Sequence, residues 1–138
     1  MGLRGLFVLL ESEIAYIAGF VDGEGSILKA NNGRGRQYVR TQIYNSDFEV
    51  LKWIRSKTGY GWLCEKKSRY DERFKVKNTK PVHMLGFSSA QSRHLIRLLL
   101  PYLRVKKQKA VEIMEWWEDY HVYREQLPRA LKVCSFAR

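Results

Sequence analysis

The sequence predicts an α+β domain in which one antiparallel sheet is covered by helices on a single face. Segments with the helical spacing of apolar residues are interleaved with short alternating segments, in the order α-β-β-α-β-β-α-α. This order favours a sheet with one face packed on helices and the other face in solvent. The chain has 138 residues, 45% of them hydrophobic, which suits one domain with its own core. We therefore take 1–138 as a single unit, with 1–11 as an N-terminal segment and 124–138 as a C-terminal tail.

The first helix is predicted over residues 13–22. Ser12 can cap its start, and the glycines Gly23 and Gly25 end it. One side of the helix carries an apolar stripe at positions i, i+3, i+4 and i+7, formed by Ile14, Ile17, Ala18 and Val21. Small residues also occur on its surface, where another backbone can approach closely: Ala15, Ala18 and Gly19.

Two strands are predicted next, over 26–30 and 38–44, joined by a turn rich in Gly and Asn at 31–36. The second strand alternates, so that three of its residues share one side: Val39, Thr41 and Ile43. Arg40 and Gln42 then lie on the opposite side of this strand.

The rest of the chain predicts a second helix, further strands and two closing helices. Asp47 can cap a helix that runs through Thr58, with an apolar side formed by Val50, Leu51 and Ile54. Strands follow at 60–64 and 73–77, joined by a charged turn at 65–72, and then a short strand at 82–87. A helix starts at Ser89 or Ser92 and ends before Pro101, and a long helix covers about 106–123.

Positive charge is concentrated in the middle of the chain. The formal charge is +11, from 25 Lys and Arg against 14 Asp and Glu. Residues 1–28 carry a net charge of −3, residues 29–80 of +9 and residues 81–138 of +5. Aromatic residues are interleaved with the basic ones of the middle third: Tyr38, Tyr44, Tyr60, Trp62, Tyr70 and Phe74. A surface that faces a polyanion has this composition, so we expect contact with nucleic acid.

The sheet face turned away from the helices is the expected contact surface. Alternate strand residues would be displayed there: Lys29, Arg40, Gln42, Lys75 and Lys77. A curved ribbon of strands fits the major groove of DNA, where Arg can read guanine and Gln can read adenine. The sequence therefore places base readout on strands rather than on a recognition helix.

Two carboxylates stand at the end of the first predicted helix, in the segment Asp22-Gly23-Glu24-Gly25. Negative charge at a helix C-terminus is unfavourable because it opposes the helix dipole. A bound cation would offset this cost, and Mg²⁺ commonly uses one or two carboxylates with phosphate oxygens and water. The alternative interpretation is a glycine turn with two solvated acids.

The segment Ala15–Gly25 (AYIAGFVDGEG) resembles the LAGLIDADG motif of homing endonucleases. Two later blocks extend the resemblance. Asn45-Ser46-Asp47 opens a helix that ends in Thr58-Gly59-Tyr60-Gly61, and Leu100–Ala110 (LPYLRVKKQKA) matches a Pro-aromatic-Leu and Lys-rich segment. Together the blocks span roughly Glu11 to Tyr120. Because one copy of the motif is present, the chain is similar to the single-motif, homodimeric members of the family.

This resemblance implies a LAGLIDADG endonuclease-like fold and metal-dependent cleavage of both strands of a long DNA site, leaving 3′ overhangs. It assigns metal binding to Glu24 and to the backbone carbonyl of Gly23, with Mg²⁺ as the cofactor and Mn²⁺ or Ca²⁺ able to bind in its place. Lys106 matches a basic residue beside the active site, which orders water or stabilises the developing phosphate charge. The residue that positions water is either Gln42 or Asn45.

A homodimer follows from the chemistry that the resemblance implies. One chain supplies one Glu24, whereas two DNA strands must be cut, so two copies are needed around a two-fold axis. The expected interface is the motif helix, through Ala15, Ala18, Gly19 and Asp22, although Asp22 matches a family position that is mainly structural. A two-fold dimer predicts a roughly palindromic target.

Candidate DNA contacts come from the basic surplus and from the open sheet face. They are Lys29, Arg34, Arg36, Arg40, Gln42, Lys66, Lys67, Arg69, Arg73, Lys75, Lys77 and Lys107. The expected partners are therefore double-stranded DNA and a second copy of the chain. No apolar stretch approaches the roughly 20 residues of a membrane span, and we expect neither a signal peptide nor a membrane partner.

Two other functions stay open from the sequence. An RNA maturase would assist intron splicing and take intron RNA as its partner, and a non-cleaving regulator would only bind DNA. The presence of Glu24 favours the endonuclease, which would be intron-encoded and promote intron mobility. Cys64 and Cys134 lack disulfide or metal spacing and indicate free thiols in a reducing, intracellular setting, either cytoplasm or an organelle.

Overall fold

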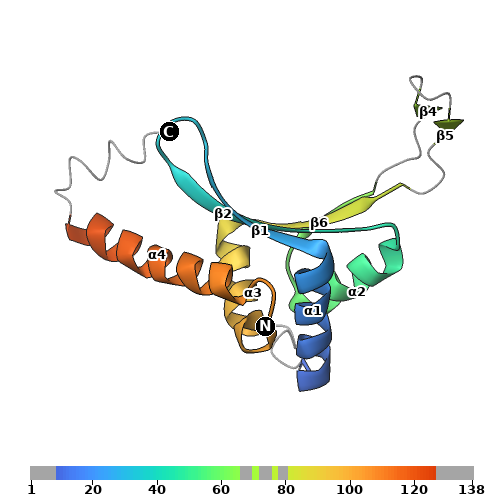
Figure 1. Ribbon diagram of the computed structural model, residues 1–138, viewed down its shortest axis with the longest axis horizontal. Coiled ribbons are helices and arrows are strands. Elements are labelled where there is room, and N and C mark those ends of the chain that lie inside the picture. The colour runs from blue at the N-terminus through green and yellow to red at the C-terminus, as the bar shows by residue number, and fades with distance from the viewer. Residues whose placement is uncertain (1–8, 66–69, 72–75, 78–80, 127–138) are drawn as a thin grey trace, which may run out of the picture.

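The computed structural model describes residues 9–65, 70–71, 76–77 and 81–126. Figure 1 shows a curved sheet with the helices packed on one of its faces. The described elements are α1 (Glu11–Glu24), β1 (Gly25–Asn31), β2 (Gln37–Asn45), α2 (Phe48–Thr58), β3 (Trp62–Cys64), β4 (Tyr70–Asp71), β5 (Val76–Lys77), β6 (His83–Phe87), α3 (Ser89–Leu99), a 3₁₀ turn (Leu100–Tyr102) and α4 (Lys107–Gln126). The α+β class with helices on a single face is confirmed.

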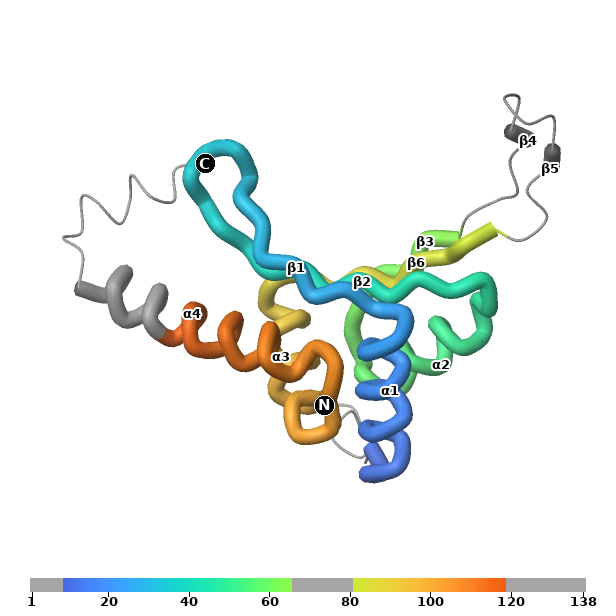
Figure 2. Tube along the Cα trace, in the orientation of Figure 1, coloured from blue at the N-terminus to red at the C-terminus, as the bar shows by residue number. Residues whose placement is uncertain are grey.

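The main sheet is antiparallel, with strand order β1-β2-β6-β3. Figure 2 shows that the β1–β2 hairpin and the outer ends of β3 and β6 extend in opposite directions from the centre of the sheet. Strands β4 and β5 pair with each other and form a separate two-stranded sheet. The turn expected over 65–72 is wrong at Tyr70–Asp71, which form β4, whereas residues 73–75 of the strand expected over 73–77 lie outside the described residues. Val76–Lys77 are a strand, but they pair with β4, so Lys77 lies outside the main sheet.

Helix α1 is longer than predicted and begins at Glu11, with Leu10 as the N-cap. The carboxylate of Glu13 accepts a 3.1 Å hydrogen bond from the Leu10 N–H, which satisfies one of the free donors at the helix start. The cap expected at Ser12 is wrong because this residue lies inside the first turn. Gly23 is helical as well, and the chain leaves the helix at Gly25 in an extended conformation.

The predicted apolar patterns form the core. Ile17, Ala18 and Val21 of α1 are buried, and Ile14 packs against them. Strand β2 buries alternate residues, as its alternation predicts, namely Val39, Thr41 and Ile43. Helices α2, α3 and α4 complete the core with Leu51, Ile54, Leu95, Ile96, Leu99, Ala110 and Ile113. No described helix has the length and apolar composition that crossing a membrane requires.

Local caps and turns set the remaining boundaries. Asp47 caps α2 as predicted, its carboxylate accepting a 3.2 Å bond from the Val50 N–H. Helix α3 begins at Ser89, and the cap is the preceding Ser88. Strand β3 begins only at Trp62, because Gly59 and Gly61 have φ angles of +79° and +102° and form the turn before it.

Candidate nucleic-acid interface and metal site

The C-terminal end of α1 is held against the loop that precedes α4. Asp22 accepts two backbone hydrogen bonds from this loop, from the N–H of Arg104 at 2.7 Å and from the N–H of Lys106 at 3.0 Å. In return, the Lys106 ammonium donates a 2.6 Å hydrogen bond to the Asp22 carbonyl. Residues 84 positions apart are therefore fixed beside each other, and Lys106 is placed at the end of the motif helix.

The titration of Asp22 reflects these contacts. Partial burial acts to raise the pKa of the Asp22 carboxyl group, because it disfavours the charged form. The backbone N–H groups of Arg104, Lys106 and Val105, together with the Lys106 charge, act in the opposite direction and prevail, so the pKa lies below its ordinary value. The carboxylate thus stays ionised and holds the loop, which agrees with a structural role for Asp22.

Glu24 is the last residue of α1, and its side chain is exposed. No described residue forms a hydrogen bond or an ion pair with its carboxylate. A carboxylate at this end of a helix is disfavoured by the helix dipole, whereas the neighbouring Lys106 ammonium is favoured there. Within the described part of the chain, Glu24 is therefore an anionic ligand without a partner, two residues after Asp22, whose backbone carbonyl binds the Lys106 ammonium.

The donor set at this helix end fits a hard divalent cation only in part. Glu24 offers carboxylate oxygens, and the carbonyl of Gly23 is among the last four of α1, which have no partner within the helix. Both are oxygen ligands of the kind that Mg²⁺ takes. Within the described ranges, however, no three His, Cys, Asp or Glu side chains gather as a complete metal site. Further ligands would have to come from water, from phosphate or from another chain.

The open face of the sheet is defined by the register of β1 and β2. Residues paired across these strands share a face, so Leu28 lies with Arg40, and Ser26 lies with Gln42. Arg40 is exposed and Gln42 half-buried on this face, opposite the buried side of β2. The prediction that Arg40 and Gln42 share the face turned away from the helices is confirmed.

Lys29 does not belong to the open face. It pairs with the buried Val39 and therefore points to the helix side of the sheet. There its ammonium lies 4.7 Å from the ring centroid of Trp116 in α4. The predicted placement of Lys29 beside Arg40 is wrong because Lys29 has the same strand phase as the buried Ile27.

The other candidate residues lie in several places. Arg34 and Arg36 are exposed in the β1–β2 turn, where the side chains of Asn31 and Asn32 accept backbone hydrogen bonds. Lys107 is exposed at the start of α4. Five further candidates fall outside the described residues, namely Lys66, Lys67, Arg69, Arg73 and Lys75. Lys77 belongs to the separate β4–β5 pair.

The two residues considered for positioning water have different surroundings. Gln42 pairs with Ser26, two residues beyond Glu24, and its side-chain oxygen accepts a 3.2 Å hydrogen bond from the Tyr44 hydroxyl. Asn45 ends β2, and its side-chain oxygen accepts a 2.7 Å bond from the Asp47 N–H. Asn45 therefore has a local role in starting α2, whereas Gln42 lies on the open face. Both assignments stay predictions.

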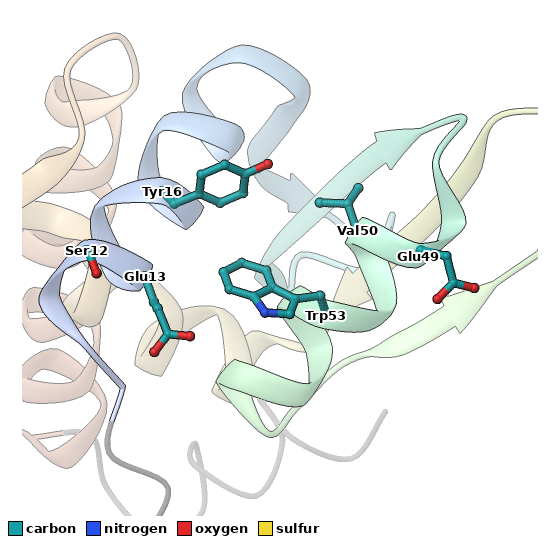
Figure 3. Close-up of a pocket in the computed structure, with 6 residues that line it drawn as sticks. All are labelled: Ser12, Glu13, Tyr16, Glu49, Val50 and Trp53. Carbon is teal, nitrogen blue, oxygen red and sulfur yellow. The ribbon is translucent and has the colours of Figure 1, made fainter.

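The expected dimer face of α1 is only partly exposed. Ala15 and Gly19 lie on the surface, whereas Ala18 is fully buried in the core of its own chain, so its surface placement is wrong. Beside this surface, an open groove of about 510 Å³ runs between α1 and α2. Figure 3 shows Tyr16 and Trp53 meeting across it, and their rings are edge-on at 5.5 Å.

Sequence reasoning missed one feature of the open face. Trp62 lies there with Arg40, and Gly86 leaves room for its indole ring. The sequence shows Trp62 among the basic residues of the middle third, but it does not show that Trp62 contacts Arg40. The contact follows from the pairing of β3 with β6, which places Trp62 beside Gly86. The sequence pattern alone does not indicate which strands pair.

Comparisons with known proteins identify the fold. No family model and no curated protein matches the sequence. Solved structures do match. The homing endonuclease I-CvuI, in complex with the I-CreI target, has a TM-score of 0.62, 19% identity and coverage of 76% of this chain and 65% of its own. The archaeal intron-encoded homing endonuclease I-Vdi141I, complexed with DNA, has a TM-score of 0.57, 20% identity and coverage of 76% and 66%.

A third similar structure is the group I intron-encoded homing endonuclease I-CeuI, complexed with DNA. Its TM-score is 0.60 at 15% identity, with coverage of 98% of this chain and 69% of its own. The chain spans less than two thirds of the lengths of I-CvuI and I-Vdi141I. At these identities the comparisons show the fold: the chain has the α+β fold found in LAGLIDADG homing endonucleases.

Proposed function

We propose that this chain is a site-specific DNA endonuclease that hydrolyses phosphodiester bonds with a divalent metal. The observation that carries the proposal is the Glu24 carboxylate at the end of α1, which has no partner among the described residues, on the same helix end that binds the Lys106 ammonium through the Asp22 carbonyl. At this point α1 runs directly into β1, the first strand of the open sheet (Figure 1). Similar folds in complex with DNA support the same function.

Residues at the end of α1 and on the neighbouring elements would have separate roles in the reaction. Glu24 and the Gly23 carbonyl would hold Mg²⁺, with Mn²⁺ or Ca²⁺ able to replace it. When bound, the metal lowers the pKa of a water ligand and offsets charge on the phosphate oxygens. Lys106, held by its hydrogen bond to the Asp22 carbonyl, stabilises the negative charge that develops on the phosphate. Gln42 or Asn45 orients the attacking water.

The proposed active form is a homodimer. One chain carries one Glu24, and two strands must be cut, so a second copy is needed. The exposed surface of α1 is suited to close packing with a second helix. Gly19 has no side chain, and a Cβ atom there would meet nothing within 4 Å in the single chain, so this space is open to a partner. Ala15 lies on the same exposed surface. Two such helices around a two-fold axis would bring both Glu24 side chains together and require a roughly palindromic target.

The biological role follows from the proposed chemistry. A double-strand break with 3′ overhangs in a long target would promote mobility of an intron that encodes the chain, and such a protein would act inside the cell or an organelle. Two of the similar structures are intron-encoded endonucleases. The alternative functions are an RNA maturase and a non-cleaving DNA-binding regulator, and a chain with either function would bind nucleic acid without cutting DNA.

A cleavage assay with matched variants tests the proposal. Glu24→Gln keeps the size of the side chain but removes its charge, so we expect DNA binding without cleavage. Glu112→Gln is the control, because Glu112 is an exposed carboxylate on α4, hydrogen-bonded only to Gln108 among the described residues. Cleavage that persists in Glu24→Gln at the wild-type rate would refute the assignment of the site.

A further inference from the structure

The side chain of Trp62 lies across the sheet rather than upright on it. Trp62 pairs with Gly86 in β6, and Gly86 pairs with Gln42 in β2, so the three residues form one row across the open face. A Cβ atom at Gly86 would lie 2.4 Å from Cζ2 and 2.5 Å from Cε2 of Trp62. The indole therefore occupies the space that a side chain at position 86 would fill.

The indole ring reaches Arg40 on β2. The guanidinium carbon of Arg40 lies 5.9 Å from the ring centroid of Trp62 and 5.3 Å from that of Tyr38. No described residue forms a hydrogen bond or an ion pair with the Arg40 side chain. Contact with aromatic rings restrains a guanidinium group while leaving its N–H donors available. Arg40 is thus held on the open face by aromatic rings, and none of its N–H donors is used by a described residue.

We propose that Trp62 is a positioning residue for base recognition: lying across Gly86, it holds Arg40 so that the guanidinium group reads a guanine in the major groove. This inference rests on the proposed DNA-cleaving function. Arg contacts guanine through O6 and N7 with two parallel hydrogen bonds, and this contact requires a defined orientation of the side chain. Restraining a long side chain before binding reduces the entropy lost on binding.

The test measures base preference rather than cleavage. The whole chain would select sequences from random double-stranded DNA in Ca²⁺, and the relative affinity for each base would be measured at every position of the selected site. Arg40→Ala identifies the position that Arg40 reads, where the preference for guanine should fall about tenfold or more. Trp62→Ala should reduce the preference at that same position about two- to fivefold, leaving the other positions unchanged.

Two further variants separate positioning from a general effect on the sheet. Gly86→Ala keeps Trp62 but displaces its indole, so it should lower the preference at the same position. Leu28→Ala removes an exposed apolar side chain paired with Arg40 on the same face and should leave that preference unchanged. Circular dichroism and thermal unfolding check that each variant is folded, and Trp62→Phe replaces Trp62→Ala if the latter unfolds.

The outcomes distinguish the inference from the function on which it rests. If the wild-type chain selects a defined site but Trp62→Ala and Gly86→Ala leave the guanine preference intact, the positioning role is overturned and the DNA-reading function stands. An equal loss in Leu28→Ala also overturns it, because the effect then arises from the sheet as a whole. If the wild-type chain selects no sequence at all, the proposed function fails and this inference fails with it.

Discussion

Replacing Asp22 with Asn tests how the end of α1 is fixed to the loop before α4. The Asp22 carboxylate accepts backbone hydrogen bonds on both of its oxygens, at 2.7 and 3.0 Å. An Asn side chain has one acceptor oxygen, and its NH₂ group would face one of the two N–H donors. The loss of one hydrogen bond to a charged acceptor lowers the free energy of unfolding by about 1.5–3 kcal/mol, which is the expected effect of Asp22→Asn.

Urea unfolding followed by circular dichroism measures this difference. Protein concentration must be equal in all samples, because self-association makes apparent stability depend on concentration. Asp47→Asn is the matched control: Asp47 accepts a single 3.2 Å bond as the cap of α2, and Asn caps helices as well as Asp does. We expect this control to change stability by less than about 0.5 kcal/mol. A loss in Asp22→Asn no larger than in Asp47→Asn would show that the paired hydrogen bonds of Asp22 do not stabilise the end of α1.

The same contacts predict a pH dependence. The pKa of Asp22 is lower in the folded chain than its ordinary value of 3.8, because the backbone donors and Lys106 outweigh the effect of burial. A group with a lowered folded pKa stabilises the fold above its unfolded pKa, and this contribution disappears as the pH falls through the folded value. The stability difference between wild type and Asp22→Asn should therefore be constant near neutral pH and shrink below about pH 4. A difference that does not change with pH would contradict the ionised carboxylate.

Three further predictions follow from single positions. Gly19→Leu should not destabilise the isolated chain, since a Cβ there meets nothing within 4 Å, but it should abolish the dimer in sedimentation experiments; an intact dimer would exclude this helix face as the interface. Arg40→Ala should weaken DNA binding and lower its sequence preference, whereas Lys29→Ala, which removes a side chain lying over Trp116, should change both little; equal losses in the two variants would contradict the placement of Arg40 and Lys29 on opposite faces of the sheet. Gly25→Ala should cost about 1–3 kcal/mol in urea unfolding, because its Cβ would lie 2.8 Å from the Val21 carbonyl oxygen; unchanged stability would argue against this close approach.

The parts of the fold that depend on local pattern could be predicted from the sequence. The helical spacing that includes Ile17 and Val21 marks the buried side of α1, and alternation marks the buried side of β2. The cap at Asp47 follows from the same local chemistry. These features require only residues near one another in the chain, so the sequence contains the whole signal.

Features that depend on partners far along the chain could not be predicted in the same way. In β1, Ile27 and Leu28 are adjacent and both apolar, so the strand alone does not say which side is buried. Pairing with β2 decides it, and Lys29 consequently lies over Trp116, a residue of α4. The fit of Trp62 over Gly86 likewise depends on which strands become neighbours.

The sequence pattern indicates a cation site at the two carboxylates that end α1, but only the resemblance assigns the metal to Glu24. The carboxylates Asp22 and Glu24 look equivalent in the sequence, but the structure separates them. Asp22 is occupied by hydrogen bonds to Arg104 and Lys106, whereas Glu24 has no partner among the described residues. Contacts between residues 84 positions apart in the chain thus distinguish the two acids. Asp22 is occupied by the loop before α4, and Glu24 is left as the acid that can bind a metal.

The proposed endonuclease activity is tested by mapping every new end that the protein creates in intron-free genomic DNA of its source organism. The reaction would be run with Mg²⁺, without it, and with Glu24→Gln. We predict one dominant double-strand break with 3′ overhangs at a roughly palindromic site, requiring both Mg²⁺ and Glu24. Tight binding to DNA or to intron RNA with no break under any condition would contradict the endonuclease and leave the regulator or the maturase as the function.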